Sequence, residues 1–277
     1  MLSTEEAILR LRQDPAWQQR LRDSYLDGDA RAAAERFASS GEFKEALALL
    51  GPRLPGACVL DLGAGTGIAS YAFAKAGAAR VVALEPDPSP VVGRGALEPL
   101  VSGLAVEALA GTGEGIPLAD ASVDVAYARQ VLHHIPDLGP ALRECARVLK
   151  PGGCLLACRE HVVDSPGQIA QFLASHPVHQ LAGGEGAHSL RGYQQAIRQA
   201  GFELKASLGP WDSVINAFPG FLSQQALLEY PALRLRARLG RLGGWLGQSA
   251  WARGLVKRHL DQPLPGRLYS FFAVKPA

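Results

Sequence analysis

The chain has 277 residues, 48% of them hydrophobic and 19% charged, with a formal net charge of +2 at pH 7. The length suits one α/β domain with additions, and the composition is that of an ordinary folded protein. No apolar run approaches the length of a membrane-spanning helix, and the first residues lack the pattern of a signal peptide. We therefore expect a cytoplasmic protein without a transmembrane segment.

Residues 4–50 are predicted to form two or three helices. Ser3 or Thr4 can cap the first helix, because a hydroxyl accepts a hydrogen bond from the first turn, and two glutamates suit that turn. Residues 23–29 interrupt the apolar periodicity, and a second helix is expected from about residue 30 to 50. A short turn then leads into the first strand.

The stretch over residues 57–70 is the most informative part of the chain. Four apolar residues lead to Asp61, and Gly63, Gly65 and Gly67 follow before a helix-like segment. This order predicts a buried parallel strand, a tight turn and a helix N-terminus. The spacing differs from the G-x-G-x-x-G of dinucleotide-binding turns, because an isoleucine replaces the third glycine. A carboxylate beside the turn suits a ligand with an ammonium group better than a pyrophosphate.

Strands and helices alternate from this turn to about residue 156, as in a sheet built of right-handed βαβ units. The second strand ends at Glu85, the third precedes Thr112, and the fourth ends near Arg129. Side chains that follow parallel strands gather at one edge of the sheet, so these residues and Asp61 are expected to share one cleft.

Four cysteines are present, and they do not form a disulfide framework. Cys154 and Cys158 lie on one expected strand, about 13 Å apart at ~3.3 Å per residue, which is too far for a disulfide bond. Cys58 falls in another expected strand and Cys145 in a helix. We expect buried, reduced thiols.

Five ordered segments together resemble a known family. They are residues 57–70, 80–87, 111–118, 122–137 and 147–156. They resemble the small-molecule branch of the class I S-adenosylmethionine (SAM)-dependent methyltransferases, which includes the ubiquinone and menaquinone C-methyltransferases. The resemblance implies an α/β fold with a Rossmann-like, seven-stranded, mostly parallel, doubly wound sheet. N-terminal helices and a helical insertion before an antiparallel last strand would complete it.

The resemblance also implies an enzyme that uses SAM and releases S-adenosylhomocysteine. Asp61 would bind the methionine ammonium and Glu85 the ribose hydroxyls. Thr112 would meet the adenine, at a position where the family often has an aspartate, and Arg129 would lie near the methionine end. The expected cofactor-binding residues are Asp61, Gly63, Ala64, Gly65, Gly67, Glu85, Pro86, Thr112, Gly113, Glu114, Arg129 and Gln130.

Acceptor-binding and catalytic residues are expected after the fourth and fifth strands. Arg159, Glu160 and His161 follow the fifth strand and should reach the acceptor side of the cleft, together with His133. Where the acceptor must lose a proton, His161 or Glu160 can act as the base, with His134 behind them. A surface ion pair between Arg159 and Glu160 is the alternative.

The histidines are unevenly distributed, with six of the seven between His133 and His188. No pair has zinc-ligand spacing with a supporting cysteine or acid. The metal-binding acids of the magnesium-dependent catechol methyltransferases have no counterpart in the chain. No metal is predicted.

We divide the chain into a helical N-terminal cap (1–50), a SAM-binding domain (51–218), a helical insertion (219–266) and the domain's final strand (267–277). In the family that the sequence resembles, N-terminal helices commonly lie over the cofactor. Tyr25 is therefore expected in the wall of the site and against the acceptor. An ordinary tyrosine at a helix end is the alternative.

The insertion carries the positive charge of the chain. Residues 221–277 hold nine basic and two acidic residues, whereas residues 1–220 hold nineteen and twenty-four. Arg234, Arg238 and Arg241 recur at helical spacing beside a row of leucines. We expect a lid over the cleft that attracts an acidic, lipid-linked or carrier-bound acceptor or contacts a membrane. A solvated basic face is the alternative.

Three functions fit these observations. The first is methyl transfer from SAM to an oxygen, nitrogen or carbon of a small molecule by in-line displacement. The second is other SAM chemistry, such as cyclisation or cleavage of the aminobutyryl chain. The third is a non-catalytic SAM-binding partner protein, which the presence of both Asp61 and Glu85 makes less favoured. No nucleic-acid partner is expected, and the sequence does not define the oligomeric state.

Overall fold

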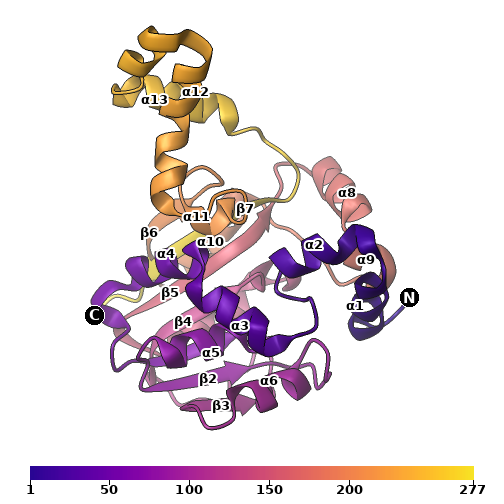
Figure 1. Cartoon of the computed structure of the whole chain (residues 1–277). Coiled ribbons are helices and arrows are strands. Elements are labelled where there is room, and N and C mark those ends of the chain that lie inside the picture. The colour runs from indigo at the N-terminus through magenta and orange to yellow at the C-terminus, as the bar shows by residue number, and fades with distance from the viewer.

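A seven-stranded sheet forms the centre of the computed structural model, which describes residues 1–277 (Figure 1). The strand order is β3-β2-β1-β4-β5-β7-β6, and only β7 runs antiparallel to its neighbours. The strands are β1 (Cys58–Leu62), β2 (Arg80–Leu84), β3 (Val106–Leu109), β4 (Val123–Arg129), β5 (Leu149–Val162), β6 (Glu203–Leu208) and β7 (Arg267–Val274). This confirms the Rossmann-like fold and the antiparallel last strand.

Both faces of the sheet are buried, and this explains why the central strands are apolar throughout. Successive side chains of a strand point to opposite faces. Val59 and Val125 accordingly belong to one core and Leu60 and Ala126 to the other. Helices must therefore cover both faces, as is usual for parallel sheets.

Four helices cover one face and two the other. The first face packs against α3 (Ala30–Ser39), α4 (Gly41–Leu50), α5 (Ile68–Lys75) and α6 (Arg94–Val101). The second packs against α7 (Leu138–Val148) and α10 (Leu190–Gln199). The single helix expected over residues 30–50 is thus two helices. They meet at Ser40, whose hydroxyl accepts a hydrogen bond from the Phe43 N–H at 3.0 Å and caps α4.

The first two helices lie at the end of the sheet, beside a later segment of the chain (Figure 1). α1 (Thr4–Gln13) and α2 (Pro15–Asp23) neighbour α8 (Pro166–Ser175) and α9 (Pro177–Ala182), with Leu2 N–H donating to the Leu181 carbonyl at 3.0 Å. Ser3 caps α1 in a capping box with Glu6, so the expected cap is confirmed. Glu5 of α1 also accepts a hydrogen bond from the Ser89 hydroxyl at 2.6 Å, which ties the cap to the loop after β2.

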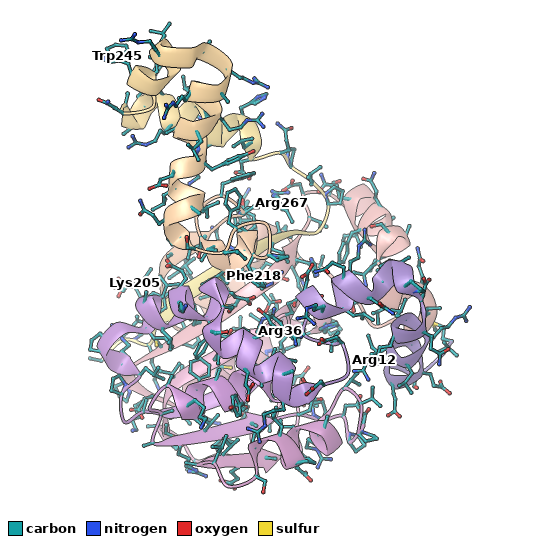
Figure 2. All side chains as sticks on the ribbon, viewed as in Figure 1. Arg12, Arg36, Lys205, Phe218, Trp245 and Arg267 are labelled. Carbon is teal, nitrogen blue, oxygen red and sulfur yellow. The ribbon has the colours of Figure 1, made fainter.

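The insertion between β6 and β7 forms a helical arm that projects away from the sheet (Figure 1). The arm consists of α12 (Gln224–Leu246) and α13 (Ala250–Leu260), and α11 (Val214–Ala217) lies at its base. Trp245 lies at the far end (Figure 2). α12 bends at Gly240, which has a φ of 57°. The expected leucine row is therefore interrupted, and Leu239 and Leu242 are 49% and 59% exposed.

Two further expectations can be compared with the structure. All four cysteines are free, and only Cys58 is not fully buried. None of the helices combines the length and the apolar character that crossing a bilayer requires.

Candidate active site

A cavity of about 560 Å³ lies where the N-terminal helices meet the turns after the parallel strands. The turn after β1 lines it through Gly63, Ala64, Gly65 and Thr66. Side chains of α1 and α2 and of residues 176–185 complete the wall. Its volume is within the ordinary range for a small-molecule site.

The glycines of the turn are required by close packing. Gly63 has a φ of 62°, and a Cβ there would lie 2.6 Å from Cγ2 of Val131. Gly67 has a φ of 83°, and a Cβ there would lie 2.7 Å from Cγ of Leu97. Any side chain at either position would therefore be strained and would collide with a neighbour. The turn is held so that its backbone forms part of the cavity wall.

Two carboxylates flank this turn in different ways. Asp61 lines the cavity, accepts a hydrogen bond from the Ser70 hydroxyl at 2.5 Å, and is so buried that its pKa is raised to about 7. Glu85 accepts hydrogen bonds from the N–H groups of Gly65 at 2.8 Å and Asp87 at 2.9 Å. Burial also raises the pKa of Glu85. Glu85 therefore anchors the turn through the Gly65 N–H and does not itself line the cavity.

A buried ion pair links the N-terminal helices to the end of β4. The guanidinium of Arg129 donates to both oxygens of Glu42 on α4, at 2.6 and 3.2 Å. Glu42 is 0% exposed. Burial acts to lower the pKa of Arg129, but the charge and hydrogen bonds of Glu42, with smaller contributions from Tyr127 and Tyr25, together raise it above its usual value. The Arg129 guanidinium also stacks on the Tyr25 ring, 5.2 Å from its centroid.

A second buried guanidinium lies beside the first. Arg159 donates to the carbonyl oxygens of Ile215 at 2.7 Å and Phe218 at 2.9 Å, and lies 3.9 Å from Glu42. Its Nε has no hydrogen-bond partner. Burial lowers the pKa of Arg159. One carboxylate thus faces two guanidinium groups in the cavity wall, and the alternative of a surface ion pair between Arg159 and Glu160 is not found.

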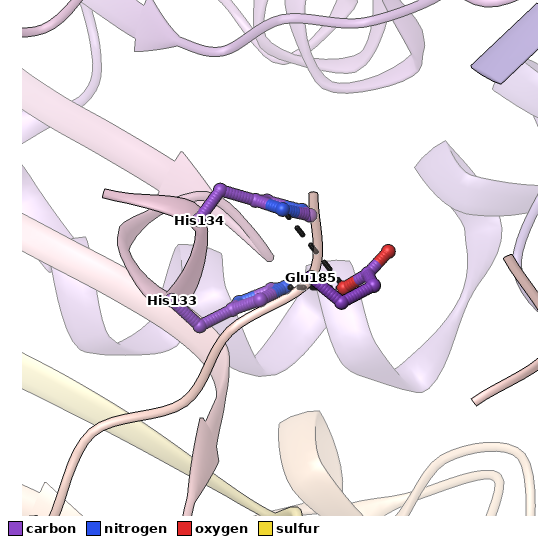
Figure 3. A group of neighbouring side chains, drawn as sticks. All are labelled: His133, His134 and Glu185. Carbon is purple, nitrogen blue, oxygen red and sulfur yellow. Dashed lines mark ion pairs between the residues drawn. The ribbon is translucent and has the colours of Figure 1, made fainter. Parts of the chain in front are cut away.

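Three imidazoles of the wall lie around one carboxylate, and a fourth contacts one of them. Nε2 of His133 lies 3.5 Å from Glu185, and Nδ1 of His134 lies 3.9 Å from the same oxygen (Figure 3). Nδ1 of His176 lies 3.8 Å from the other oxygen of Glu185. The ring of His161 stands edge-on to that of His133, with 4.7 Å between centroids. Burial raises the pKa of Glu185, but the surrounding histidines lower it to about 2.

Glu160 orients His133 and does not reach the cavity. Its carboxylate accepts hydrogen bonds from the N–H groups of Val131 at 3.1 Å and His133 at 3.0 Å, and from Nδ1 of His133 at 2.8 Å. Burial opposes ionisation of Glu160, yet these donors lower its pKa. The side chain is 0% exposed and holds three hydrogen bonds, so it lies behind His133, and the cavity position expected for a base is not found for Glu160.

His161 has one ring nitrogen fixed and the other free. Its Nδ1 donates to the carbonyl oxygen of Gly266 at 2.7 Å, which leaves the lone pair on Nε2. Burial and the neighbouring His133 lower the pKa of His161 to about 4. His161 lines the cavity as a neutral imidazole.

The structure gathers most, but not all, of the expected residues in one wall. Those that line the cavity are Tyr25, Asp61, Gly63, Ala64, Gly65, Arg129, Gln130, His133, His134, Arg159 and His161. Those that do not are Gly67, Glu85, Pro86, Thr112, Gly113, Glu114 and Glu160. Thr112 and Glu114 are exposed on the loop after β3.

The expected lid is not over the cavity. Of the insertion, only Pro219 lines it, and the helices α1, α2 and α9 enclose it instead. The physical reason is that α12 leaves the sheet beside α11 and projects outward (Figure 1), so that its arginines and leucines lie away from the site.

Three functional residues were not identified from the sequence. Glu42 is 87 residues from its partner Arg129, and nothing in α4 indicates the pairing. Glu185 and His176 lie in a connection with glycines, which gives no periodic signal. The concentration of histidines before residue 188 was the one available sign.

Known proteins share both the domain and the fold. A family described as a methyltransferase domain matches residues 60–157. The 27-O-demethylrifamycin SV methyltransferase of Amycolatopsis mediterranei is 29% identical over 238 residues, which are 82% of this chain and 85% of that protein. The ubiquinone biosynthesis O-methyltransferase of Hahella chejuensis is 41% identical over 104 residues, 37% of this chain and 42% of that protein.

A solved structure agrees at the level of the fold. The geranyl diphosphate C-methyltransferase of Streptomyces coelicolor A3(2), solved with Mg²⁺, geranyl diphosphate and S-adenosyl-L-homocysteine, has a TM-score of 0.54 at 14% identity. The match covers 84% of this chain and 77% of that one. Fold, glycine turn and relatives together define a SAM-dependent methyltransferase. The matched domain and the named relatives support a class I methyltransferase that uses SAM as its cofactor.

The Glu42 carboxylate gives a prediction for stability. Glu42→Gln removes the charge that compensates two buried guanidinium groups, and we expect it to lower the free energy of unfolding by about 3–5 kcal/mol. Adding Arg129→Met should recover part of this loss, because no unpaired charge then remains at that position. Urea denaturation followed by circular dichroism measures both.

Glu107→Gln is the matched control, since its pair with Arg80 is half exposed on the surface. It should cost less than about 1 kcal/mol. If Glu42→Gln were as mild as Glu107→Gln, the buried pair would not hold the N-terminal helices on the sheet.

Proposed function

We propose that the protein transfers the methyl group of SAM to a small-molecule acceptor held between the glycine turn and the cluster of imidazoles. The observation that carries this proposal is that one cavity includes both the turn with Asp61 and the side chains of Arg159, His133, His134 and His161. The relative named for 27-O-demethylrifamycin SV supports an acceptor of this kind. The acceptor atom is an oxygen, nitrogen or carbon nucleophile.

The residues around the turn fit the cofactor. Asp61 places a buried carboxylate in the wall, and a bound ammonium group would keep that carboxylate ionised. The backbone from Gly63 to Gly65 is exposed to the cavity, so a flat ligand can lie against it. We assign the methionine ammonium of SAM to Asp61 and the methionine end to the region of Arg129 and Gln130.

We assign the ribose and the adenine of SAM to residues that follow the neighbouring strands β2 and β3. Each oxygen of Glu85 accepts one backbone hydrogen bond and keeps a second lone pair for a ribose hydroxyl. Pro86 follows it, and the loop with Thr112, Gly113 and Glu114 comes after β3, which pairs with β2. We assign the adenine to this loop, which lies beside the cavity and not in its wall.

Transfer requires positioning and, for a protonated acceptor, a base. In-line displacement is accelerated mainly when the nucleophile is held against the methyl group in a near-attack geometry. Tyr25, Arg159 and His133 are the residues that we assign to this task. His161 is the base that we favour, because its Nε2 carries a lone pair and the ring lines the cavity.

Methyl-labelled SAM tests the proposed function. Incubation of the protein with labelled SAM and an extract of the organism that encodes it should move the label to a new small metabolite. Loss of SAM without transfer of the label would instead support cyclisation or cleavage of its aminobutyryl chain. Binding of SAM with no turnover in any extract would support a non-catalytic partner protein.

His161→Asn refines the same measurement. It should lower transfer of the label by about 10²–10⁴-fold if His161 is the base, while affinity for S-adenosylhomocysteine stays unchanged. His259→Asn, on α13, is the matched control and should transfer label normally.

Substitution of Glu85 tests the cofactor assignment. Glu85→Ala removes two ribose contacts to a charged group, and affinity for S-adenosylhomocysteine should fall by ~2–4 kcal/mol in calorimetric titration. The loss also includes the anchor on the Gly65 N–H, which the sequence did not predict.

Glu107→Ala is the control, because Glu107 lies on β3 with an exposed side chain. It should bind S-adenosylhomocysteine as the wild type does. Unchanged affinity in a folded Glu85→Ala variant would contradict the ribose assignment.

The helical arm supports a second part of the proposal, which concerns the source of the acceptor. Its surface combines exposed Trp245 and Trp251, 67% and 72% exposed, with Arg234, Arg238 and Arg241. Aromatic and basic side chains together favour an anionic lipid surface. We propose that the arm docks the enzyme on such a membrane and that the acceptor is acidic and lipid-linked, in preference to one bound to a carrier.

Co-sedimentation with anionic vesicles tests the docking. Changing Arg234, Arg238 and Arg241 to glutamine should weaken binding about tenfold or more at low salt, since each basic residue near such a surface contributes about 1 kcal/mol. The control changes Arg143, Arg191 and Arg198, which are exposed on α7 and α10, and should bind as the wild type does. If the wild type does not bind these vesicles, the proposed docking of the arm on a membrane is wrong.

A further inference from the structure

The imidazoles around Glu185 have the arrangement of metal ligands. His133, His134 and Glu185 each offer one ligand atom, and these atoms lie within 4.8 Å of one another (Figure 3). Two donors on one zinc ion, each about 2.0–2.2 Å from it, are roughly 3.0–3.5 Å apart. The 3.5 Å between Nε2 of His133 and Glu185 already meets this spacing. The His134 ring lies farther away, with its Nδ1 3.9 Å from the same oxygen.

The supporting contacts match those of metal-bound histidines. Nδ1 of His133 donates to Glu160 at 2.8 Å, which leaves Nε2 as the ligand atom facing Glu185. Nδ1 of His134 lies nearest to Glu185 but donates to the Gly184 carbonyl at 2.9 Å, so Nε2 carries the lone pair and the ring must turn to bind the ion. A carboxylate or carbonyl behind the ring is the usual partner of a ligating histidine, because it fixes the tautomer.

One buried polar atom beside the cluster has no partner. Nδ1 of His176 is buried without a hydrogen bond and lies 3.8 Å from the oxygen of Glu185 that does not face His133 and His134. Buried polar atoms are rarely left unpaired in native structures. A cation between His176 and Glu185 would satisfy both.

We propose that His133, His134 and Glu185 bind one divalent transition-metal ion in the acceptor half of the cavity, with His176 as a fourth ligand. Imidazole and carboxylate together suit Zn²⁺, Fe²⁺ or Co²⁺ better than Mg²⁺, which prefers oxygen ligands. This differs from the expectation from sequence, because Glu185 lies some fifty residues beyond the histidine pair. No local spacing joins them.

The ion would face the acceptor directly. The ligands line the same cavity as Asp61 and the glycine turn, so an oxygen of the acceptor could complete the coordination. A bound hydroxyl would give its proton to His161, form the new oxygen–carbon bond with the methyl group and release S-adenosylhomocysteine as the sulfur–carbon bond breaks. This role rests on the proposed methyl transfer, whereas binding of the ion does not.

Titration of the metal-free protein with Zn²⁺ alone tests the site. After dialysis against a chelator, wild type should take up one Zn²⁺ per chain in calorimetry, and Co²⁺ should give visible absorption bands. Glu185→Gln and His134→Gln should each weaken binding at least tenfold, because loss of even an outer contact costs about 10–100-fold. His134 is half exposed and tolerates substitution, so the fold of this variant is expected to survive.

His179→Gln is the matched control, since His179 lies on α9 outside the ligand group. It should bind Zn²⁺ as wild type does, and all variants should keep their affinity for S-adenosylhomocysteine. Absence of stoichiometric uptake, equal affinity in all variants, or a preference for Mg²⁺ over Zn²⁺ would each overturn the metal site. None of these outcomes would affect the test of methyl transfer.

Discussion

The ion pair between Glu42 and Arg129 joins parts of the molecule that the chain separates by 87 residues. Glu42 comes from the helices that precede the sheet, and Arg129 ends the central strand β4. The pair is buried, so its geometry must be maintained for the charges to be tolerated. Tyr25 rests on the Arg129 guanidinium, and the wall of the cavity is built outward from this contact. The joint between the helices that precede the sheet and the cavity wall thus depends on one carboxylate.

Charge is distributed unevenly along this wall. At one place two guanidinium groups share a single carboxylate, which leaves an excess of positive charge. At another, the buried carboxylate of Asp61 lies beside the glycine turn. A ligand with both an acidic and a basic group would be oriented by this pattern, because each end finds its opposite. SAM, with a carboxylate and an ammonium group at its methionine end, is such a ligand.

The sequence was sufficient for the fold and for the turn that meets the cofactor. Buried parallel strands and the glycines at 63, 65 and 67 have local signals, because a strand requires apolar residues and the turn requires positive φ. No local pattern in the sequence indicated that the side chain of Glu160 points away from the cavity. The register of β5 against β7 shifts between Ala157 and Glu160, and Arg159 has a φ of 60°, so alternation along the strand could not place their side chains. The sequence also did not indicate where the arm lies, because the bend at Gly240 and the point where α12 leaves the sheet beside α11 depend on tertiary packing.

The hydrogen bond between Ser89 and Glu5 bears on the order of events in a catalytic cycle. It connects the loop that follows Glu85 to the first helix, and the same helix packs against α9. Under the proposed assignment, the first helix would border both the cofactor side and the acceptor side of the cavity. A displacement of the first two helices would then widen the route by which the spent nucleoside and the methylated product leave. Turnover would then follow the opening of this cover, and chemistry at the sulfonium need not limit the rate.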